Sequence, residues 1–497
     1  MIVIFVHGWS VRNTNTYGGL PLYLAGKNGP DGRPLEVADI VLGRYVSFED
    51  TVTLDDISRA FDYALSEAVG DRISRGERIA CITHSTGGPV VRNWLNLYHG
   101  GDLAQCPLSH LVMLAPANHG SALAQLGKGR LSRMKFFAQG VQPGERVLDW
   151  LELGSPEAWA LNESWIDQPW VSDGIFPFVL TGQTIDRSFY DALNSYTDEV
   201  AGDGVVRVAA ANLNYSLLAL AQNANQDLVT VNQRRTKACA MGILPKVAHS
   251  GEDIGIIRSV SAAGTRPEAA VRSLKLTSPD HPTAQWVLRC LGVANATDYD
   301  AVRLELESLT ARVQQDEQFD KQRTVFGTRR YPNSRCTQVI VRIRDDRGDT
   351  LTDYDLFLTA GPRYSPDDLP PGFFVDRQRN SRSPGTLTYF LNWDVLNDAA
   401  KGLRHPKLEA KLGFRIVARP QMSEPETNDG MAQARLAGYR TLDFKSNLDV
   451  LAEHLRPNET LMVDIQLRRL VDAAVFRADK DLAPRQFKAE PENRLIP

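Results

Sequence analysis

Ser85 is the residue whose type and setting most strongly predict chemistry in this sequence. It follows a short apolar segment at 78–83 and precedes Gly87 and Gly88, after which a helix is predicted. A strand that turns sharply into a helix at a serine is typical of a nucleophile elbow, which lifts the hydroxyl oxygen above the edge of a sheet. Thr83 stands where the usual pattern has a glycine, so the match is incomplete. A Ser-x-Gly-Gly stretch also occurs in ordinary turns, but the strand-to-helix setting favours the catalytic interpretation.

A serine nucleophile requires hydrogen-bond donors aimed at the oxyanion that develops during acyl transfer. The backbone N–H of Thr86 is one candidate, because the helix that follows adds the positive end of its dipole at the same place. The loop His7-Gly8-Trp9 after the first strand offers a second donor, the backbone N–H of Trp9. A His-Gly pair after a strand is also found in plain turns. Its occurrence together with the serine motif favours an oxyanion hole formed by Trp9 and Thr86.

Ser85 also requires a general base, and we expect that base to be His249. Nine histidines are present, and in folds with a nucleophile elbow the triad runs in the chain order serine, acid, histidine. His405 and His454 fall in the C-terminal β region, so that order leaves His249 and His281 for the last place. His249 lies in a polar loop that suits a projecting imidazole, whereas His281 precedes a proline in a turn and is expected at the surface. His119 follows a predicted strand end and is a further candidate for contact with the site.

Asp203 is the leading candidate for the carboxylate that orients the base. It lies between Gly202 and Gly204, which permit a sharp turn, and two apolar valines follow. A buried carboxylate at this place would fix the tautomer of His249 and stabilise its protonated form. An ordinary Asp-Gly turn is the alternative interpretation. Two other aspartates are held in reserve, Asp186 and Asp198.

The elements that must position these residues alternate between short apolar strands and amphipathic helices. Apolar residues recur at helical spacing over 54–75, and a second helix is predicted over 89–98. Short strands are predicted at 1–6, 78–83 and 111–115. Strand–helix–strand alternation of this kind predicts an α/β fold with a mostly parallel sheet that is covered by helices on both faces.

The segment at about 121–175 is predicted to be a lid-like insertion over this sheet. It combines a basic stretch with many large aromatic side chains, namely Lys128, Arg130, Arg133, Lys135, Phe136, Phe137, Trp150, Trp159, Trp165 and Trp170. A mobile lid with an apolar inner face would cover an acyl pocket and open on a lipid surface. The alternative is that these aromatic residues form the core of a small helical subdomain.

The composition changes near residue 330, so we divide the chain into a catalytic domain at 1–330 and a β-rich domain at 331–497. The second part shows apolar strands separated by turn-rich segments, near 337–343, 354–358, 386–391, 414–418 and 460–467. That spacing predicts an all-β, sandwich-like domain. It is a candidate for binding a partner that the sequence does not identify.

Bulk composition excludes several classes of protein. The net charge of −4 gives no signature of nucleic-acid binding, and no apolar run is long enough to span a bilayer, so any membrane contact is expected to be peripheral. Because no basic n-region or cleavage site is seen before the first strand, we do not expect a cleavable leader. The five scattered cysteines show neither metal-binding spacing nor disulfide density. We therefore expect no metal and no cofactor, and either a cytoplasmic location or export without a cleaved signal peptide.

Together these motifs resemble the bacterial lipases and phospholipases of the α/β-hydrolase superfamily. The resemblance rests on His7-Gly8-Trp9, His84-Ser85-Thr86-Gly87-Gly88, Asp203-Gly204-Val205-Val206, His249 and the stretch Pro116 to Ser121. It covers about residues 1–260 and implies hydrolysis of a lipid-like carboxylic ester through an acyl-enzyme on Ser85. A thioesterase or amidase on the same triad is the alternative enzyme. A non-catalytic adaptor with a relict hydrolase core is the alternative outside enzymes.

Overall fold

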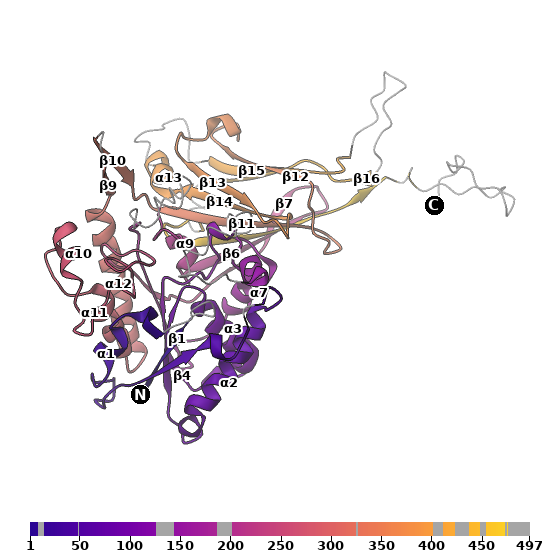
Figure 1. Cartoon of the computed structure of the whole chain (residues 1–497). Coiled ribbons are helices and arrows are strands. Elements are labelled where there is room, and N and C mark those ends of the chain that lie inside the picture. The colour runs from indigo at the N-terminus through magenta and orange to yellow at the C-terminus, as the bar shows by residue number, and fades with distance from the viewer. Residues whose placement is uncertain are drawn as a thin grey trace.

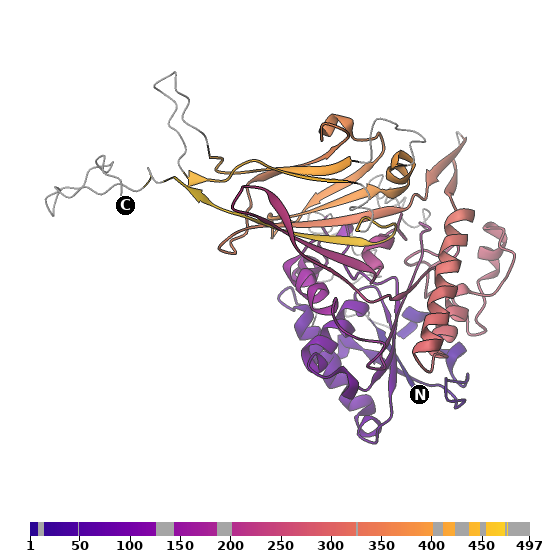
Figure 2. The same ribbon diagram turned by 180° about the vertical axis from the view of Figure 1, so that it is seen from behind.

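The structure is a computed structural model of the 497-residue chain. It describes residues 1–7, 14–47, 49–125, 144–185, 201–324, 327–400, 411–422, 437–447, 454–472 and 475. Figure 1 shows two stacked parts: an α/β layer that carries the N-terminus, and a β-rich layer above it. Figure 2 shows from behind that α12 lies along the outer side of the first part.

The first part is built on a parallel sheet with the strand order β2-β1-β3-β4-β5-β8. These strands are β1 (Ile2–His7), β2 (Glu36–Val41), β3 (Ile79–His84), β4 (Leu108–Leu114), β5 (Phe176–Thr181) and β8 (Ala240–Ile243). Residues Ile2 to Val6 of the first strand are buried, so their side chains alternate between two apolar cores rather than between core and solvent. Val6 belongs to one core and Phe5 to the other.

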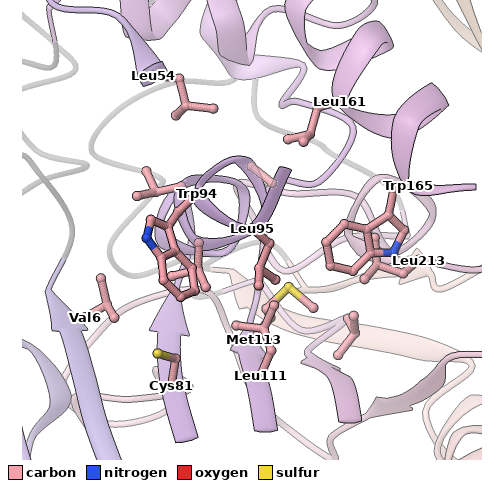
Figure 3. Close-up of a cluster of buried hydrophobic side chains, with 14 of the residues drawn as sticks. Val6, Leu54, Cys81, Trp94, Leu95, Leu111, Met113, Leu161, Trp165 and Leu213 are labelled. Atoms are coloured by element: carbon pink, nitrogen blue, oxygen red, sulfur yellow. The ribbon is translucent and has the colours of Figure 1, made fainter. Parts of the chain in front are cut away.

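Helices cover both faces of this sheet. One face packs against α2 (Leu54–Ile73), α3 (Gly87–His99), α6 (Glu145–Leu151) and α7 (Pro156–Trp165). The other packs against α1 (Leu20–Leu24), α11 (Pro282–Leu291) and α12 (Ala296–Asp316), with α10 (Glu268–Ser273) nearby. The long helix α2 begins at a capping box, in which Thr53 and Asp56 each satisfy a backbone N–H of the other. Figure 3 shows Trp94 and Leu95 of α3 lying against the sheet residues Cys81 and Met113.

The tryptophans of the predicted insertion lie inside the protein. Trp150, Trp159, Trp165 and Trp170 all belong to the core on the α3 side of the sheet. Trp165 and Trp170 stack with their ring centroids 3.5 Å apart. These four side chains are therefore part of the main hydrophobic core on this face of the sheet. The basic stretch and both phenylalanines lie outside the described residues, so the lid-like insertion at about 121–175 stays a prediction.

The second part contains a mixed six-stranded sheet with the order β13-β14-β11-β18-β6-β7. Its strands are β6 (Tyr215–Gln222), β7 (Leu228–Arg235), β11 (Cys336–Asp345), β13 (Phe374–Arg379), β14 (Thr386–Asn392) and β18 (Thr460–Leu467). The late strand β18 lies between β11 and β6 and is parallel to both. Because β6 and β7 precede residue 330, the two parts share strands. The division at residue 330 stays a prediction.

The strands β6, β11 and β18 of this second sheet are mostly buried on both faces. Leu217, Ile340 and Met462 point into the hydrophobic core that also contains α3 and α7. The alternate residues Leu218, Val341 and Val463 point into a separate core shared with a three-stranded sheet, β12-β15-β17. Those strands are β12 (Tyr354–Ala360), β15 (Lys411–Ala418) and β17 (Leu442–Asn447). The predicted α/β fold with a C-terminal sandwich is confirmed, and the sandwich is packed directly onto the α/β core.

Smaller elements complete the chain. A hairpin joins β9 (Phe319–Thr324) to β10 (Gly327–Pro332), and β16 (Ala437–Gly438) pairs with β19 (Leu470–Val471). Two short helices are α9 (Val208–Ala211) and α13 (Trp393–Ala400). Within the described ranges, no helix has both the length and the apolar character that crossing a bilayer requires.

Candidate active site

Ser85 lies immediately after β3, near the middle of the parallel sheet. Its backbone is left-handed, with φ of 54°, a conformation that non-glycine residues rarely adopt. The strained turn is held on both sides: the Ser85 N–H donates to the carbonyl of Leu114 at 3.0 Å, and the Ala117 N–H donates to the carbonyl of Ser85 at 3.3 Å. The structure therefore gives Ser85 the backbone geometry of a nucleophile elbow.

The glycines after the serine are required by close packing. A Cβ on Gly88 would lie 2.9 Å from the Cβ of Pro116, and one on Gly87 would lie 3.3 Å from the Cβ of Thr83. Thr83 is fully buried in β3. The threonine that departs from the usual pattern is therefore accommodated because its neighbour across the turn, Gly87, has no side chain.

His249 lies within hydrogen-bond distance of both other predicted triad members. The Ser85 Oγ–H donates to His249 Nε2 at 3.2 Å, and the His249 Nδ1–H donates to Asp203 Oδ2 at 2.9 Å. The His249 backbone N–H also donates to the carbonyl of Asp203 at 3.0 Å. The structure thus brings Ser85, His249 and Asp203 together in one hydrogen-bonded chain.

Asp203 is fully buried, so its carboxylate needs compensating hydrogen bonds. Its second oxygen, Oδ1, accepts the backbone N–H groups of Val205 and Val206 at 3.0 and 2.8 Å. The turn that presents these donors passes through Gly204, whose φ of 98° favours glycine. This predicted Asp-Gly turn therefore serves to hold a buried carboxylate against an imidazole.

His84 is a neighbour of the site to which the sequence assigned no role. Its Nε2–H donates to the backbone carbonyl of His249 at 3.1 Å, and the two imidazole centroids lie 4.7 Å apart. Burial is the main cause, and the nearby His249 a smaller one, that lowers the pKa of His84 well below its usual value. A neutral His84 therefore fixes the backbone of His249. Its place directly before Ser85 was the available signal.

A buried arginine, Arg92, links α3 to the loop after β4 and to α7. Arg92 on α3 is fully buried, and its guanidinium donates to the side-chain oxygens of Asn118 at 3.1 Å and Asn162 at 2.9 Å. It also lies 4.5 Å from the ring centroid of Trp165. Burial lowers the pKa of Arg92 to about 10. Sequence patterns gave no sign of this network, because its members come from separate elements.

The remaining predicted site residues fall in different places. Thr86 occupies the N-cap position of α3, directly after the serine, without a capping hydrogen bond from its side chain. Trp9, the other predicted oxyanion donor, and the reserve acids Asp186 and Asp198 lie outside the described residues.

Two other histidines that were weighed are core residues. His119 packs edge-on against Tyr215, and burial lowers its pKa to about 3. The surface position expected for His281 is wrong: it is buried, caps α11 and donates to Ser259 at 2.7 Å. Its burial follows from the packing of α11 on the sheet, which its local sequence does not reveal. In the part of the chain that the structure describes, no cluster of three or more metal-ligating side chains is found.

The fold and this chain of side chains define the α/β-hydrolase class. No protein-family profile matches the sequence, and no curated protein matches it significantly. Among solved structures, the chain is similar to phospholipase PlaB from Legionella pneumophila, solved alone and in complex with thio-NAD. Each of these structures is 49% identical to this chain, covers 100% of both chains and has a TM-score of 0.84. The chain belongs to the phospholipase PlaB family and is a carboxylic-ester hydrolase. The resemblance to bacterial lipases and phospholipases is confirmed.

Proposed function

We propose that Ser85 is the nucleophile, His249 the general base and Asp203 the orienting acid of this ester hydrolase. The observation that carries the proposal is the unbroken hydrogen-bond chain from Ser85 Oγ through His249 to Asp203, at 3.2 and 2.9 Å, with the serine on a left-handed turn. These are the distances at which a proton can pass from a hydroxyl to an imidazole.

The reaction proceeds by acyl transfer. His249 Nε2 takes the Ser85 proton as Oγ attacks the ester carbonyl, and the protonated imidazole then returns that proton to the departing alcohol. Water repeats the sequence on the acyl-enzyme, which releases the acid and restores the serine. The backbone N–H groups of Thr86 and Trp9 are proposed to stabilise the oxyanion. Asp203, held by two backbone donors, would stabilise the imidazolium that forms.

A phospholipid is the proposed ester substrate, and peripheral contact with a lipid surface the proposed setting. Support comes from the 49% identity with a phospholipase over the whole chain. The proposal is tested by vesicles and micelles of phospholipid, triglyceride and acyl-thioester, together with labelling by a fluorophosphonate probe. We expect wild-type labelling, release of fatty acid from phospholipid, and neither with Ser85→Ala.

Two outcomes would contradict parts of this proposal. Unlabelled wild-type protein would favour the relict adaptor. Labelling together with faster turnover of the thioester, or of an acyl-amide added to the same panel, would favour the alternative enzymes.

We also propose that the chain binds a nicotinamide dinucleotide. The support is that the PlaB structure was solved in complex with thio-NAD. Calorimetric titration with NAD, using adenosine as the control, tests this directly. An absence of heat at millimolar NAD would contradict it.

A reducing compartment is the proposed setting for synthesis. All five cysteines are free and buried. Burial raises the pKa of the Cys106 thiol to about 11, so little reactive thiolate forms there. Mass spectrometry after thiol alkylation in the unfolded state should find all five thiols unoxidised.

A further inference from the structure

The segment that carries Asp203 lies between the α/β core and the second sheet. It runs from Ala201 through Asp203 to Asn212 and includes the short helix α9. Ala201 and Ala209 share a small buried cluster with Phe390 of β14 and Cys336 of β11. Figure 1 shows α9 directly beneath β11. The proposed acid therefore belongs to a segment that contacts the C-terminal strands.

Polar contacts from β18 and the residues before it fix the far end of this segment. The Thr460 Oγ1–H donates to the carbonyl of Ala209 at 2.9 Å. The Asn212 side-chain amide donates to the carbonyl of Asn458 at 2.8 Å. Both contacts end on backbone carbonyls. The first therefore restrains the backbone at Ala209, and the second restrains the backbone at Asn458.

Arg207, midway along the segment, connects it to β13, an edge strand of the second sheet. Its guanidinium donates to Asp376 Oδ2 on β13 at 2.7 Å and lies 4.2 Å from the ring centroid of Phe390. The Arg207 side chain is 7% exposed and that of Asp376 34%. A largely desolvated arginine of this kind makes a stronger and more directional ion pair than a pair on the open surface.

The backbone transmits the position of Arg207 to Asp203. Gly202 and Arg207 form an antiparallel bridge, and the Asp203 N–H donates to the carbonyl of Val206 at 3.2 Å. The Val206 N–H in turn donates to the Asp203 carboxylate. A shift of Arg207 would therefore move the donors that hold the carboxylate.

We propose that the second sheet is the platform that positions Asp203, and that Arg207 is the positioning residue through its contacts with Asp376 and Phe390. This inference rests on the proposed function, in which Asp203 orients the base. Arg207 lies outside the reaction itself. It acts by keeping the Asp203 carboxylate at hydrogen-bond distance from His249.

A positioning role predicts a specific kinetic pattern. A misplacement of about 1 Å within a catalytic group typically lowers the rate about 100-fold. Because Arg207 contacts the acid segment rather than the ester, its loss should lower kcat and leave KM nearly unchanged.

The test compares Arg207→Met, Arg207→Lys and Asp376→Asn with the full-length wild type. The matched control is Arg415→Gln, which breaks an Arg–Asp pair between β15 and β17, Arg415 with Asp443 at 2.7 Å, away from the acid segment. Readouts are kcat and KM on a short p-nitrophenyl ester, the rate of fluorophosphonate labelling, and the folded fraction from circular dichroism.

We expect Arg207→Met to lower kcat and the labelling rate about 10- to 100-fold with KM within twofold. Arg207→Lys should recover part of that loss, Asp376→Asn should lose several-fold, and Arg415→Gln should match wild type. If Arg207→Met does not fold, the same comparison is made with Asp376→Asn, whose side chain is more exposed.

The proposal is overturned if folded Arg207→Met or Asp376→Asn keeps the wild-type kcat, or if Arg415→Gln loses as much activity as they do. Failure of the proposed function gives a different result. In that case wild-type protein itself is unlabelled, or Ser85→Ala is labelled as fast as wild type.

Discussion

The two large sheets of this protein differ in how far apart in sequence their neighbouring strands lie. In the parallel sheet, β1, β3, β4 and β5 lie side by side in the same order as in the sequence. Only β2 departs from this order, because it lies at the edge beside β1. In the second sheet, β18 is inserted between β6 and β11, so strands from distant parts of the chain are paired. The proposed nucleophile follows a strand of the parallel sheet, whereas the segment of the proposed acid packs against the second sheet.

Ser85 is therefore held by contacts that are local in sequence, whereas Asp203 is also held by contacts from distant parts of the chain. Ser85 is fixed by its own strand, its own helix and the next strand, through Leu114 and Ala117. Asp203 is fixed by its own turn together with contacts from β13, β14 and β18 to the segment that follows it. A change in the C-terminal part can therefore reach the reaction through the acid.

The largest effect is expected from Asp203→Asn, which changes the acid side while leaving the nucleophile side intact. An amide at this position would favour the wrong tautomer of His249, so kcat should fall about 10⁴-fold. Steady-state kinetics on a soluble ester would measure this, with circular dichroism as the control for folding. A loss below tenfold would show that another carboxylate orients the base.

A change at the boundary between the two parts should separate stability from catalysis. Met462 faces the core shared with α3, whereas Leu461 faces the core of the sandwich. Replacement of either residue by alanine should lower the free energy of unfolding by about 2–5 kcal/mol. We expect Met462→Ala also to lower kcat of the folded fraction, and Leu461→Ala to leave it unchanged. Equal kcat in the two folded variants would mean that this boundary does not transmit strain to the site.

A smaller effect should come from the local packing at the elbow. Gly87→Ala places a Cβ 3.3 Å from the Cβ of Thr83, and overpacking of this kind costs about 1–3 kcal/mol. Thr83→Gly removes the opposing Cβ, so the double variant should lose less stability than the two single changes added together. Urea unfolding of the four proteins measures the coupling. Strict additivity would show that Thr83 and Gly87 pack independently.

The most gradual effect is expected from pH. Burial lowers the pKa of His110 to about 4, and those of His119 and His281 to about 3. Unfolded histidine titrates near 6.5, so below that pH the unfolded chain binds more protons than the folded one. The contribution of these histidines to the free energy of unfolding is therefore fully present above pH 6.5. It falls as the pH drops toward about 4, by about 1.4 kcal/mol per pH unit for each histidine.

The variant His281→Asn isolates one of these contributions. Its unfolding free energy should depend less steeply on pH than that of wild type between pH 6.5 and 4. Urea midpoints measured across that range provide the comparison. Parallel pH curves for the two proteins would show that His281 binds a proton in the folded state.

Much of the α/β part could be predicted because its signals are local. The segments predicted as strands at 1–6 and 78–83 and as a helix at 54–75 are β1, β3 and α2, within two residues at each end. Ser85, Asp203 and His249 could be selected because each lies at a recognisable turn and because their chain order suits the fold. The edge strands β2 and β8 were missed, since most of β2 is not buried and β8 has only four residues, so both carry weaker apolar patterns.

The second part was predicted as a sandwich-like domain, but the pairing of its strands was not predicted. Strands β11, β12, β14, β15 and β18 match predicted segments, whereas β6, β7, β13 and β17 were not recognised. Pairing between distant strands leaves no local mark, because the partners meet only after the chain has folded. The surface position expected for His281 failed for the same reason, as burial depends on which helix covers which loop.

The sequence by itself determined the nature of the chemistry: a serine on a strained turn, an imidazole and a carboxylate in the right order. Residue type and short-range backbone preference are sufficient for that, because glycines and a strand-to-helix turn act within a few residues. The tertiary structure alone decided which side chains surround these groups, namely His84 against the backbone of His249, Arg92 of α3 between Asn118 and Asn162, and Arg207 between the segment of the proposed acid and the C-terminal sheet. Each of these contacts joins elements that are remote in sequence, and their meeting depends on packing that no local pattern encodes.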